Sequence, residues 1–472
     1  MTDVNQKTDS YRDSVSTVDK EGKRIWLYPK KPKGPLYKAR NLVSLFLLAI
    51  LFAGPFIKIN GQPALLLNVL ERKFYVFGLT FWPQDFYLFV LASVALVVFI
   101  ILFTVVFGRI WCGWACPQTI FMEMVFRKIE YWIEGDARRQ RELNASPMNA
   151  EKFLKRSTKH VIFFALSFLI GNTFLAYIIG ADALIKIITD SPSAHIAGLS
   201  AMLIFSGIFY WVYASFREQV CTMVCPYGRL QGVLLDKNSI VVAYDFKRGE
   251  PRENFSRKRD RSGSGDCIDC AQCVDVCPTG IDIRNGTQLE CVNCTACIDA
   301  CNSVMKKVNL PKGLIRYDSY QGIVDGTKLK FSPRILGYSS VLIVLIAALA
   351  VAMINRSDIE TTILRTPGVL YQELEDGKIS NLYNIKVINK SLEPAAIRIK
   401  SLNPFANIRM VGGELTVPGN DYLETSFFIE IPGEKVVLAN MPVAIDIYSG
   451  ENLVQSLRTS FNGPEKLRNR HD

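Results

Sequence analysis

The chain of 472 residues carries 55 Lys and Arg against 44 Asp and Glu, which gives a net charge of +11, and 49% of its residues are hydrophobic. This length argues against a single domain, and such amounts of apolar and basic residues are typical of a membrane protein with soluble parts. The basic excess gathers in loops between apolar segments. Membrane topology therefore explains it better than nucleic-acid binding, and no nucleic-acid partner is expected.

Five apolar segments have the roughly 17 to 25 residues needed to cross a bilayer. Lys and Arg number 10 in residues 1–40 and then 3, 10, 1 and 18 in the four regions between successive spans. By the positive-inside rule, the tail 1–40, the loop 108–160 and the segment 217–334 are predicted to be cytoplasmic, which leaves residues 355–472 outside. The predicted spans are 41–57, 86–107, 161–180, 197–216 and 335–354.

Two cysteine pairs follow the second and fourth spans, in GRIWCGWACPQT at 108–119 and EQVCTMVCPYGR at 218–229. Each pair has C-x3-C spacing, and residues four apart in a helix share one face. Because both pairs lie at cytoplasmic ends of spans, we expect the four thiols to face one another. They are Cys112, Cys116, Cys221 and Cys225.

Met223 lies inside the second pair, and thiolate with thioether ligands favours Cu(I) over harder ions. The four cysteines are therefore candidate catalytic groups and, together with Met223, candidate copper ligands. A third iron–sulfur cluster, structural zinc and small packing residues are the alternatives that the residues leave open. Haem is disfavoured, because the three histidines are scattered along the chain.

The other eight cysteines form CIDCAQCVDVCP at 267–278 and CVNCTACIDAC at 291–301, two C-x2-C-x2-C-x3-C repeats. This spacing is typical of two-cluster bacterial ferredoxins, in which the fourth cysteine of each repeat binds the other 4Fe-4S cluster. Structural zinc is the weaker alternative. The predicted ligands are Cys267, Cys270, Cys273 and Cys301 for one cluster, and Cys291, Cys294, Cys297 and Cys277 for the second.

Beyond the last span, apolar and polar residues alternate in short runs separated by Gly, Pro and Asn. This pattern predicts an all-β sandwich of immunoglobulin-like kind. The predicted strands are 383–390, 395–402, 413–417, 423–431 and 442–450.

The sequence as a whole predicts a multi-domain membrane protein, in which an α-helical bundle carries a ferredoxin domain and a β-domain. The predicted divisions are a basic tail at 1–40, a four-span bundle at 41–216, a ferredoxin segment at 217–334 with its core at 262–305, a last span at 335–354 and an immunoglobulin-like domain at 355–472.

The order of these parts resembles the CcoG (FixG, RdxA) family of cytochrome c oxidase accessory proteins. The resemblance rests on GRIWCGWACPQT, EQVCTMVCPYGR, the eight-cysteine segment, the last span and the outer β-domain. It implies a protein of the bacterial inner membrane, with the ferredoxin in the cytoplasm and the β-domain in the periplasm.

The same resemblance implies an activity, the reduction of Cu(II) to Cu(I) as substrate on the cytoplasmic side, for the assembly of cbb-type haem-copper oxidases. The implied partners are the oxidase assembly machinery and a copper transporter or chaperone. The electron donor, a quinol or a reductase, and the oligomeric state, a homodimer included, stay open.

A different class of function fits many of the same motifs. Membrane polyferredoxins of the nitrate and nitrous oxide reductase systems also pair C-x3-C-P motifs with two clusters. On that resemblance the protein would be a copper-independent relay that passes electrons from quinol to a redox partner. The exported β-domain favours the oxidase-assembly alternative.

Overall fold

The computed structural model describes residues 17–18, 21, 23–69, 72–254, 263–326, 333–368, 370–413 and 415–464. Parts of the predicted tail, the last eight residues and residue 262, where the predicted ferredoxin core begins, lie outside the described residues. The chain divides into two compact units, Met1–Asn68 with Val90–Ala347 (unit 1) and Val69–Phe89 with Ala348–Asp472 (unit 2). The segment Val69–Phe89 thus belongs with the C-terminal unit, although the sequence pattern assigned it to the bundle.

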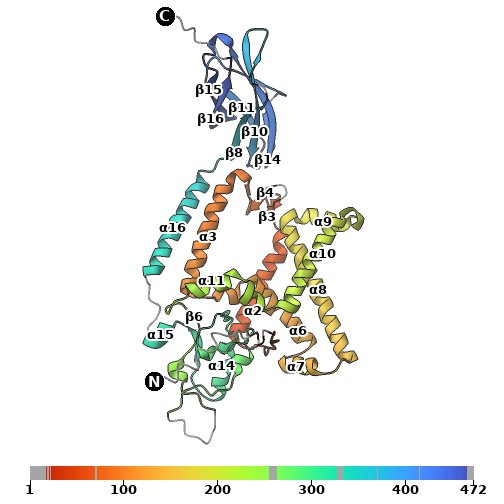
Figure 1. The fold of residues 1–472 in the computed structure, drawn as a ribbon, viewed down its shortest axis with the longest axis vertical. Coiled ribbons are helices and arrows are strands. Elements are labelled where there is room, and N and C mark those ends of the chain that lie inside the picture. Colours follow the sequence, from red (N-terminus) through yellow and green to blue (C-terminus); the bar gives the residue numbers. More distant parts are fainter. Residues whose placement is uncertain are drawn as a thin grey trace. The chain divides into compact units, whose positions relative to one another are not determined.

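Within the described residues, five helices are long and apolar enough to cross a membrane, in agreement with the predicted number. The third begins well before the expected residue 161, because the polar stretch that precedes the apolar residues continues the same helix, α8. In unit 1, α8 and α10 pack side by side (Figure 1). The bounds of the five are Pro35–Phe56 (α2 Pro35–Ala53 and η1 Gly54–Phe56), Pro83–Phe107 (η2 Pro83–Asp85 and α3 Phe86–Phe107), Ala150–Ile179 (α8), Pro192–Phe216 (η4 Pro192–His195, α10 Ile196–Trp211 and η5 Val212–Phe216) and Pro333–Ile354 (α16).

Short elements join the long helices of unit 1. After α3 come α4 (Ile110–Trp114), α5 (Pro117–Thr119), η3 (Ile120–Phe126), α6 (Arg127–Ile133) and α7 (Ala137–Ala145), and α9 (Ala181–Thr189) follows α8. After η5 come η6 (Val220–Val224) and α11 (Pro226–Leu234). Strands β1 (Lys58–Ile59), β2 (Gln62–Pro63) and β3 (Leu65–Asn68) follow η1.

The ferredoxin part of unit 1 is built on an antiparallel pair, β6 (Val241–Tyr244) with β7 (Ile315–Asp318). Its core combines apolar side chains with buried cysteines of both repeats. The remaining elements are α12 (Phe246–Gly249), α13 (Gln272–Asp275), η7 (Ile283–Asn285), α14 (Ala296–Lys307) and α15 (Tyr320–Asp325).

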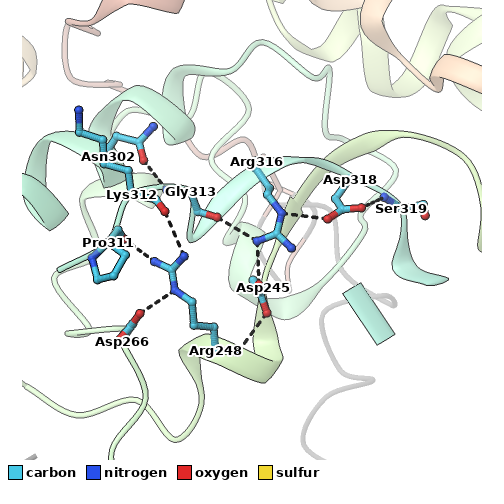
Figure 2. Close-up of polar contacts among 10 residues, drawn as sticks. All are labelled: Asp245, Arg248, Asp266, Asn302, Pro311, Lys312, Gly313, Arg316, Asp318 and Ser319. Atoms are coloured by element: carbon cyan, nitrogen blue, oxygen red, sulfur yellow. Dashed lines mark hydrogen bonds and ion pairs between the residues drawn. The ribbon is translucent and has the colours of Figure 1, made fainter. Parts of the chain in front are cut away.

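A network of ion pairs and hydrogen bonds links residues of β7, α12 and α14 in the ferredoxin part (Figure 2). Arg316 on β7 binds Asp245 at 2.7 Å and Asp318 at 2.9 Å, and Arg248 binds Asp266 at 2.6 Å. Asn302, which replaces the proline of the first repeat, accepts a hydrogen bond of 2.8 Å from the backbone N–H of Gly313. Because Asn302 lies inside α14, a proline there would remove a helix hydrogen bond.

Unit 2 contains the predicted β-sandwich. One sheet has the order β12-β14-β10-β8, with β9 on β10, and the other has the order β13-β11-β15-β16. The core between them contains apolar side chains from both sheets, such as Tyr383, Phe427 and Ile445. The strands are β8 (Ile359–Arg365), β9 (Gln372–Glu373), β10 (Lys378–Asn389), β11 (Ala395–Ser401), β12 (Asn407–Met410), β13 (Leu415–Val417), β14 (Asp421–Pro432), β15 (Asn440–Ser449) and β16 (Asn452–Asn462), with a turn, η8 (Gly433–Lys435), after β14.

The hairpin β4 (Lys73–Val76) with β5 (Leu79–Phe81) belongs to the same unit. Just after it, the buried carboxylate of Asp85 binds Arg356 at 2.8 Å and Lys390 at 2.6 Å. The buried ion cluster Asp85–Arg356–Lys390 ties this hairpin to the β-domain.

Candidate functional site: two cysteine cavities and a thiol cavity

Four cysteines of the ferredoxin segment line one small cavity, the first cysteine cavity. Its walls include the apolar side chains of Leu314 and Ile315, and Arg284 is its charged wall residue. The cysteines are Cys267, Cys270, Cys273 and Cys301. The set therefore combines three cysteines of the first repeat with the last cysteine of the second.

A second cysteine cavity has the complementary composition. It is walled by apolar side chains that include Val242, Ile281 and Val292, and Cys273 reaches it as well. The other cysteines that line it are Cys277, Cys291, Cys294 and Cys297. The structure thus places the last cysteine of each repeat beside the first three of the other repeat, and the assignment of ligands to the two clusters stays a prediction.

The backbone of both repeats has the same unusual conformation. Asp269 and Ala271 flank Cys270 with φ of 50° and 52°, and Asn293 and Thr295 flank Cys294 with φ of 53° and 64°. Left-handed backbone at non-glycine residues is strained, and alternation with right-handed residues turns successive N–H groups into one concavity, a geometry found at many Fe–S sites. Four soft thiols around each such cradle fit a 4Fe-4S cluster.

The two C-x3-C pairs surround a third and larger cavity, the thiol cavity, of about 540 Å³. Cys112, Cys116, Cys221 and Cys225 all line it. Within the described ranges, no three His, Cys, Asp or Glu side chains converge tightly enough to hold a single ion.

Neither pair is a regular helical i, i+4 pair. Cys112 lies in α4 and Cys221 in η6, but Cys116 and Cys225 have extended backbone (ψ of 124° and 112°) and precede the first residues of α5 and α11. Pro117 and Pro226 cause this, because a proline disfavours helical backbone in the residue before it. The second cysteine of each pair therefore turns away from its own helix.

π-Helical turns flank the thiols on both sides. η3, η5 and η6 are π-helices, and Arg217, between the last two, has a left-handed φ of 54°. Such turns are rare and are found frequently at functional sites. Their position beside both cysteine pairs distinguishes this region from the rest of the bundle.

Gly113 brings the thiol cavity against the second cysteine cavity. A Cβ atom at this position would lie 2.6 Å from the carbonyl oxygen of Val292 and 2.7 Å from that of Asn293. Val292 stands between Cys291 and Cys294 and lines both cavities. One residue of the ferredoxin loop therefore forms part of the wall between them.

Two buried arginines hold the same loop. Arg109 donates hydrogen bonds to the carbonyl oxygens of Cys291 (3.2 Å) and Leu289, and Arg40 on α2 donates one to that of Cys294 (3.2 Å). Arg109 also lines the thiol cavity. The sequence showed Arg109 only as a flanking cation; its contact with the ferredoxin loop is a long-range feature.

Burial raises the pKa of two thiols of the thiol cavity, Cys112 and Cys221. It raises the pKa of Cys112 to about 12, although the nearby Arg109 acts in the opposite direction. Burial, with the neighbouring thiols, also raises the pKa of Cys221 to about 12. Both thiols are therefore neutral near pH 7, and metal binding there would release protons.

Two residues near the cysteines, Met223 and Asp299, have surroundings that the sequence pattern did not indicate. Met223 is 39% exposed and is not among the residues that line the thiol cavity, so its role as a ligand stays a prediction. Asp299, between Cys297 and Cys301, accepts a hydrogen bond of 2.8 Å from the backbone N–H of Tyr37. A side chain of the ferredoxin helix α14 therefore caps the first turn of α2. Its spacing within the cysteine motif gave no signal of this contact.

Three parts of the chain match known protein families. Residues 216–320 match the family described as 4Fe-4S dicluster domain, and residues 89–139, which include Cys112 and Cys116, match the family described as 4Fe-4S binding domain. Residues 349–464 match the family described as the IG-like fold at the C-terminus of FixG.

Relatives match over most of the chain. The nitrogen fixation protein FixG of Rhizobium meliloti is 32% identical over 84% of this chain and 83% of its own length. Protein RdxA of Cereibacter sphaeroides is 34% identical over 80% of this chain and 82% of its own length. The ferredoxin-type protein NapH of Escherichia coli is 22% identical over 50% of this chain and 85% of its own length. The chain therefore belongs to the FixG/RdxA family of multi-pass membrane iron–sulfur proteins.

Proposed function

We propose that the protein reduces Cu(II) to Cu(I) in the thiol cavity, for delivery to a haem-copper oxidase that is being assembled. One observation carries this proposal: four thiols line a cavity that shares a wall residue, Val292, with the second cysteine cavity. Electrons stored in the ferredoxin part thus have a short route to an ion held by the thiols.

The ligand sets follow from the two cysteine cavities. Cys267, Cys270, Cys273 and Cys301 would hold one 4Fe-4S cluster, and Cys277, Cys291, Cys294 and Cys297 the second. Each cluster supplies one electron at a time.

The reaction transfers one electron to each Cu(II) ion and yields one Cu(I) ion. Thiolates stabilise the soft Cu(I) product more than Cu(II), so the four cysteines favour the reduced ion. A thiol must lose its proton to bind the ion, and the positive charge of Arg109 supports that loss at Cys112 and Cys221.

The cellular setting belongs to the same proposal. The ferredoxin part lies in the cytoplasm and the β-domain in the periplasm of a bacterial inner membrane. The partners are the oxidase assembly machinery, which takes up Cu(I), and a copper transporter or chaperone. The basic residues of the loops support this orientation.

A copper-independent electron relay is the second candidate function. It is favoured by the 4Fe-4S family match at 89–139, because that region contains Cys112 and Cys116 outside the ferredoxin segment. In this case the four thiols of the thiol cavity would hold a third cluster.

Metal content tests the two candidates against each other. We expect the purified, anaerobic protein to contain about eight iron atoms per chain, two clusters of four, and to bind added Cu(I). Serine at Cys112, Cys116, Cys221 and Cys225 should leave the iron content unchanged and abolish Cu(I) binding. About twelve iron atoms, with four lost in the quadruple variant, would establish a third cluster and contradict the copper site.

A further inference from the structure

The thiol cavity has an apolar end that copper chemistry does not use. Leu96, Phe99, Ile100 and Phe103, all on the membrane-spanning helix α3, form this end, and Trp111 adds an indole ring. Leu96 and Phe99 are 57% and 47% exposed on the helix surface, so this wall is continuous with the face that α3 presents to the bilayer. A lipophilic molecule could therefore enter from the membrane.

Among the described residues that line the cavity, Gln231 has a buried hydrogen-bond acceptor without a partner. Gln231 on α11 is 1% exposed, and its Nε2 donates to the carbonyl oxygen of Gly228 at 3.2 Å, but its Oε1 has no hydrogen-bond partner among the described residues. The hydroxyl of Tyr227, which also lines the cavity, is already bonded to Thr104 at 2.8 Å. An unpaired buried acceptor costs free energy, so Gln231 is prepared for a ligand that donates a hydrogen bond.

These features together describe one class of ligand. Binding sites for small molecules are mostly apolar cavities of about 300 to 1,000 Å³ with a few polar groups that fix orientation, and the thiol cavity has this size and composition. The ligand must have a hydroxyl donor, a flat ring that packs on Phe and Trp, and an apolar tail that lies along α3. Because the thiol cavity lies beside the cysteines of the ferredoxin part, we expect this ligand to exchange electrons.

We propose that the apolar end of the thiol cavity binds a membrane quinol, with a ring hydroxyl donating to Oε1 of Gln231 and the tail along Leu96, Phe99 and Ile100. This inference rests on the proposed function, because it names the reductant for copper. A phospholipid acyl chain would fill the apolar end but would leave Gln231 unpaired.

The redox balance is complete with the partners named above. One quinol releases two electrons and two protons and becomes the quinone, and two Cu(II) ions consume two electrons and become two Cu(I). The two clusters have the capacity to hold both electrons, so quinol and copper need not occupy the cavity at once. The protons leave through water and are not transferred to copper.

Photolabelling of the intact protein in nanodiscs with an azidoquinone tests the site directly. We expect label on peptides of α3 or α11, and competition by a short-chain quinol but not by added phospholipid. The I100W variant fills the apolar end and should lower labelling by about tenfold or more, the order found when a pocket is mis-sized. The Q231L variant should weaken quinol competition by about fivefold, the value of one neutral hydrogen bond.

The matched control is V97W, which places the same ring on an exposed position of α3 that does not line the cavity and should label like the parent. Equal labelling of I100W and the parent, or displacement of the label by phospholipid, would overturn the quinol site. Reduction of Cu(II) by dithionite-reduced protein needs no quinol. If that reaction persists while labelling fails, the quinol site alone is wrong; if it is absent, the proposed function fails whatever the labelling shows.

Discussion

At Gly113 the membrane bundle closely approaches the ferredoxin loop. The missing side chain of Gly113 leaves room for the carbonyl oxygens of Val292 and Asn293, both of which would lie under 3 Å from a Cβ atom. Backbone atoms on the ferredoxin side cannot move as freely as the end of a side chain. A methyl group at residue 113 would therefore increase the distance between the thiol cavity and the second cysteine cavity.

We predict that G113A keeps both clusters but slows copper reduction by about tenfold, since displacements of about 1 Å in a catalytic arrangement cost on this order or more. Iron content and visible absorbance measure the clusters, and stopped-flow kinetics measure the reduction. G207A in α10 is the matched control, because a Cβ atom there meets no atom within 4 Å. Equal rates in G113A and G207A would show that this close approach has no role in electron transfer.

Single residues of the site differ in how far the sequence reveals them. Cysteine spacing is set by local chain geometry, so the cysteines that surround each cavity follow from the motif alone. Gly113 and Arg109 act through contacts with residues distant in sequence, and the burial of Gln231 without a partner for its Oε1 also depends on the tertiary fold, so no local pattern marks these three residues. Met223 shows the opposite case, because its position inside CTMVC suggested a ligand but its side chain is partly exposed outside the cavity lining.

At the scale of elements, a buried charge network holds the segment that carries Cys221. Glu130 on α6 is bound by Arg217, which lies between the π-helices η5 and η6, and by Lys159 on α8 at 3.6 Å. Burial opposes the charged form of Glu130, but Arg217 and Lys159 hold its pKa below its usual value. Ionised Glu130 therefore stabilises the fold at neutral pH.

We predict that this contribution is lost on acidification. A depressed pKa stabilises the fold above the unfolded value of about 4.3, and the stabilisation disappears as the pH falls through the still lower folded pKa. E130Q should lower the melting temperature at pH 7, with a cost of about 3 to 5 kcal/mol for an unpaired buried charge, and should lose less stability than the parent below pH 4. An unchanged melting temperature at pH 7 would rule out a stabilising role. Scanning fluorimetry in detergent measures both proteins.

We predict that the buried ion cluster Asp85–Arg356–Lys390 also stabilises unit 2. Lys390 on the β-domain contacts Asp85 at 2.6 Å and Glu360 at 2.8 Å, and its side chain is 3% exposed. K390M should weaken protection of strand β10 against hydrogen exchange by about 3 to 5 kcal/mol, because Glu360 and Asp85 lose a buried cation and Asp85 keeps only Arg356. K386M, which breaks the exposed Lys386–Glu424 pair, should cost no more than about 1 kcal/mol. Equal protection in both variants would contradict a stabilising role for the cluster.

The strands and helices show which elements a sequence can predict. The five spans and the sandwich are set by hydrophobic length and alternation, and both are confirmed. Four strands of the sandwich, β8, β9, β12 and β16, were missed. β9 and β12 are short, β16 has the burial pattern of a largely exposed edge, and β8 comes directly after the last span. The π-helices and the long α14 also depend on tertiary contacts, such as the hydrogen bond from Gly313 to Asn302.

At the scale of the whole molecule, membrane orientation is predicted from loop charge alone. Alkaline phosphatase is active only outside the cytoplasm, so a fusion after Pro464 should be active and a fusion after Asp325 inactive. Each fusion is the control for the other, because the same reporter is attached to the same chain at two different points. Activity in the reverse order would place the ferredoxin part outside and would remove the cytoplasmic route for copper.

The central claim is that a copper ion bound by the thiols of the thiol cavity accepts the electrons that the ferredoxin part stores. It is tested most directly by reducing the purified protein anaerobically, removing excess reductant, adding Cu(II) and following Cu(I) with a chelating dye. The parent should form about two Cu(I) per chain, one for each cluster, and the variant with serine at Cys112, Cys116, Cys221 and Cys225 should keep its cluster absorbance but form Cu(I) at least about a hundredfold more slowly, because a positioned site is lost. If the quadruple variant reduces copper as fast as the parent, the thiol cavity is not the site of copper reduction.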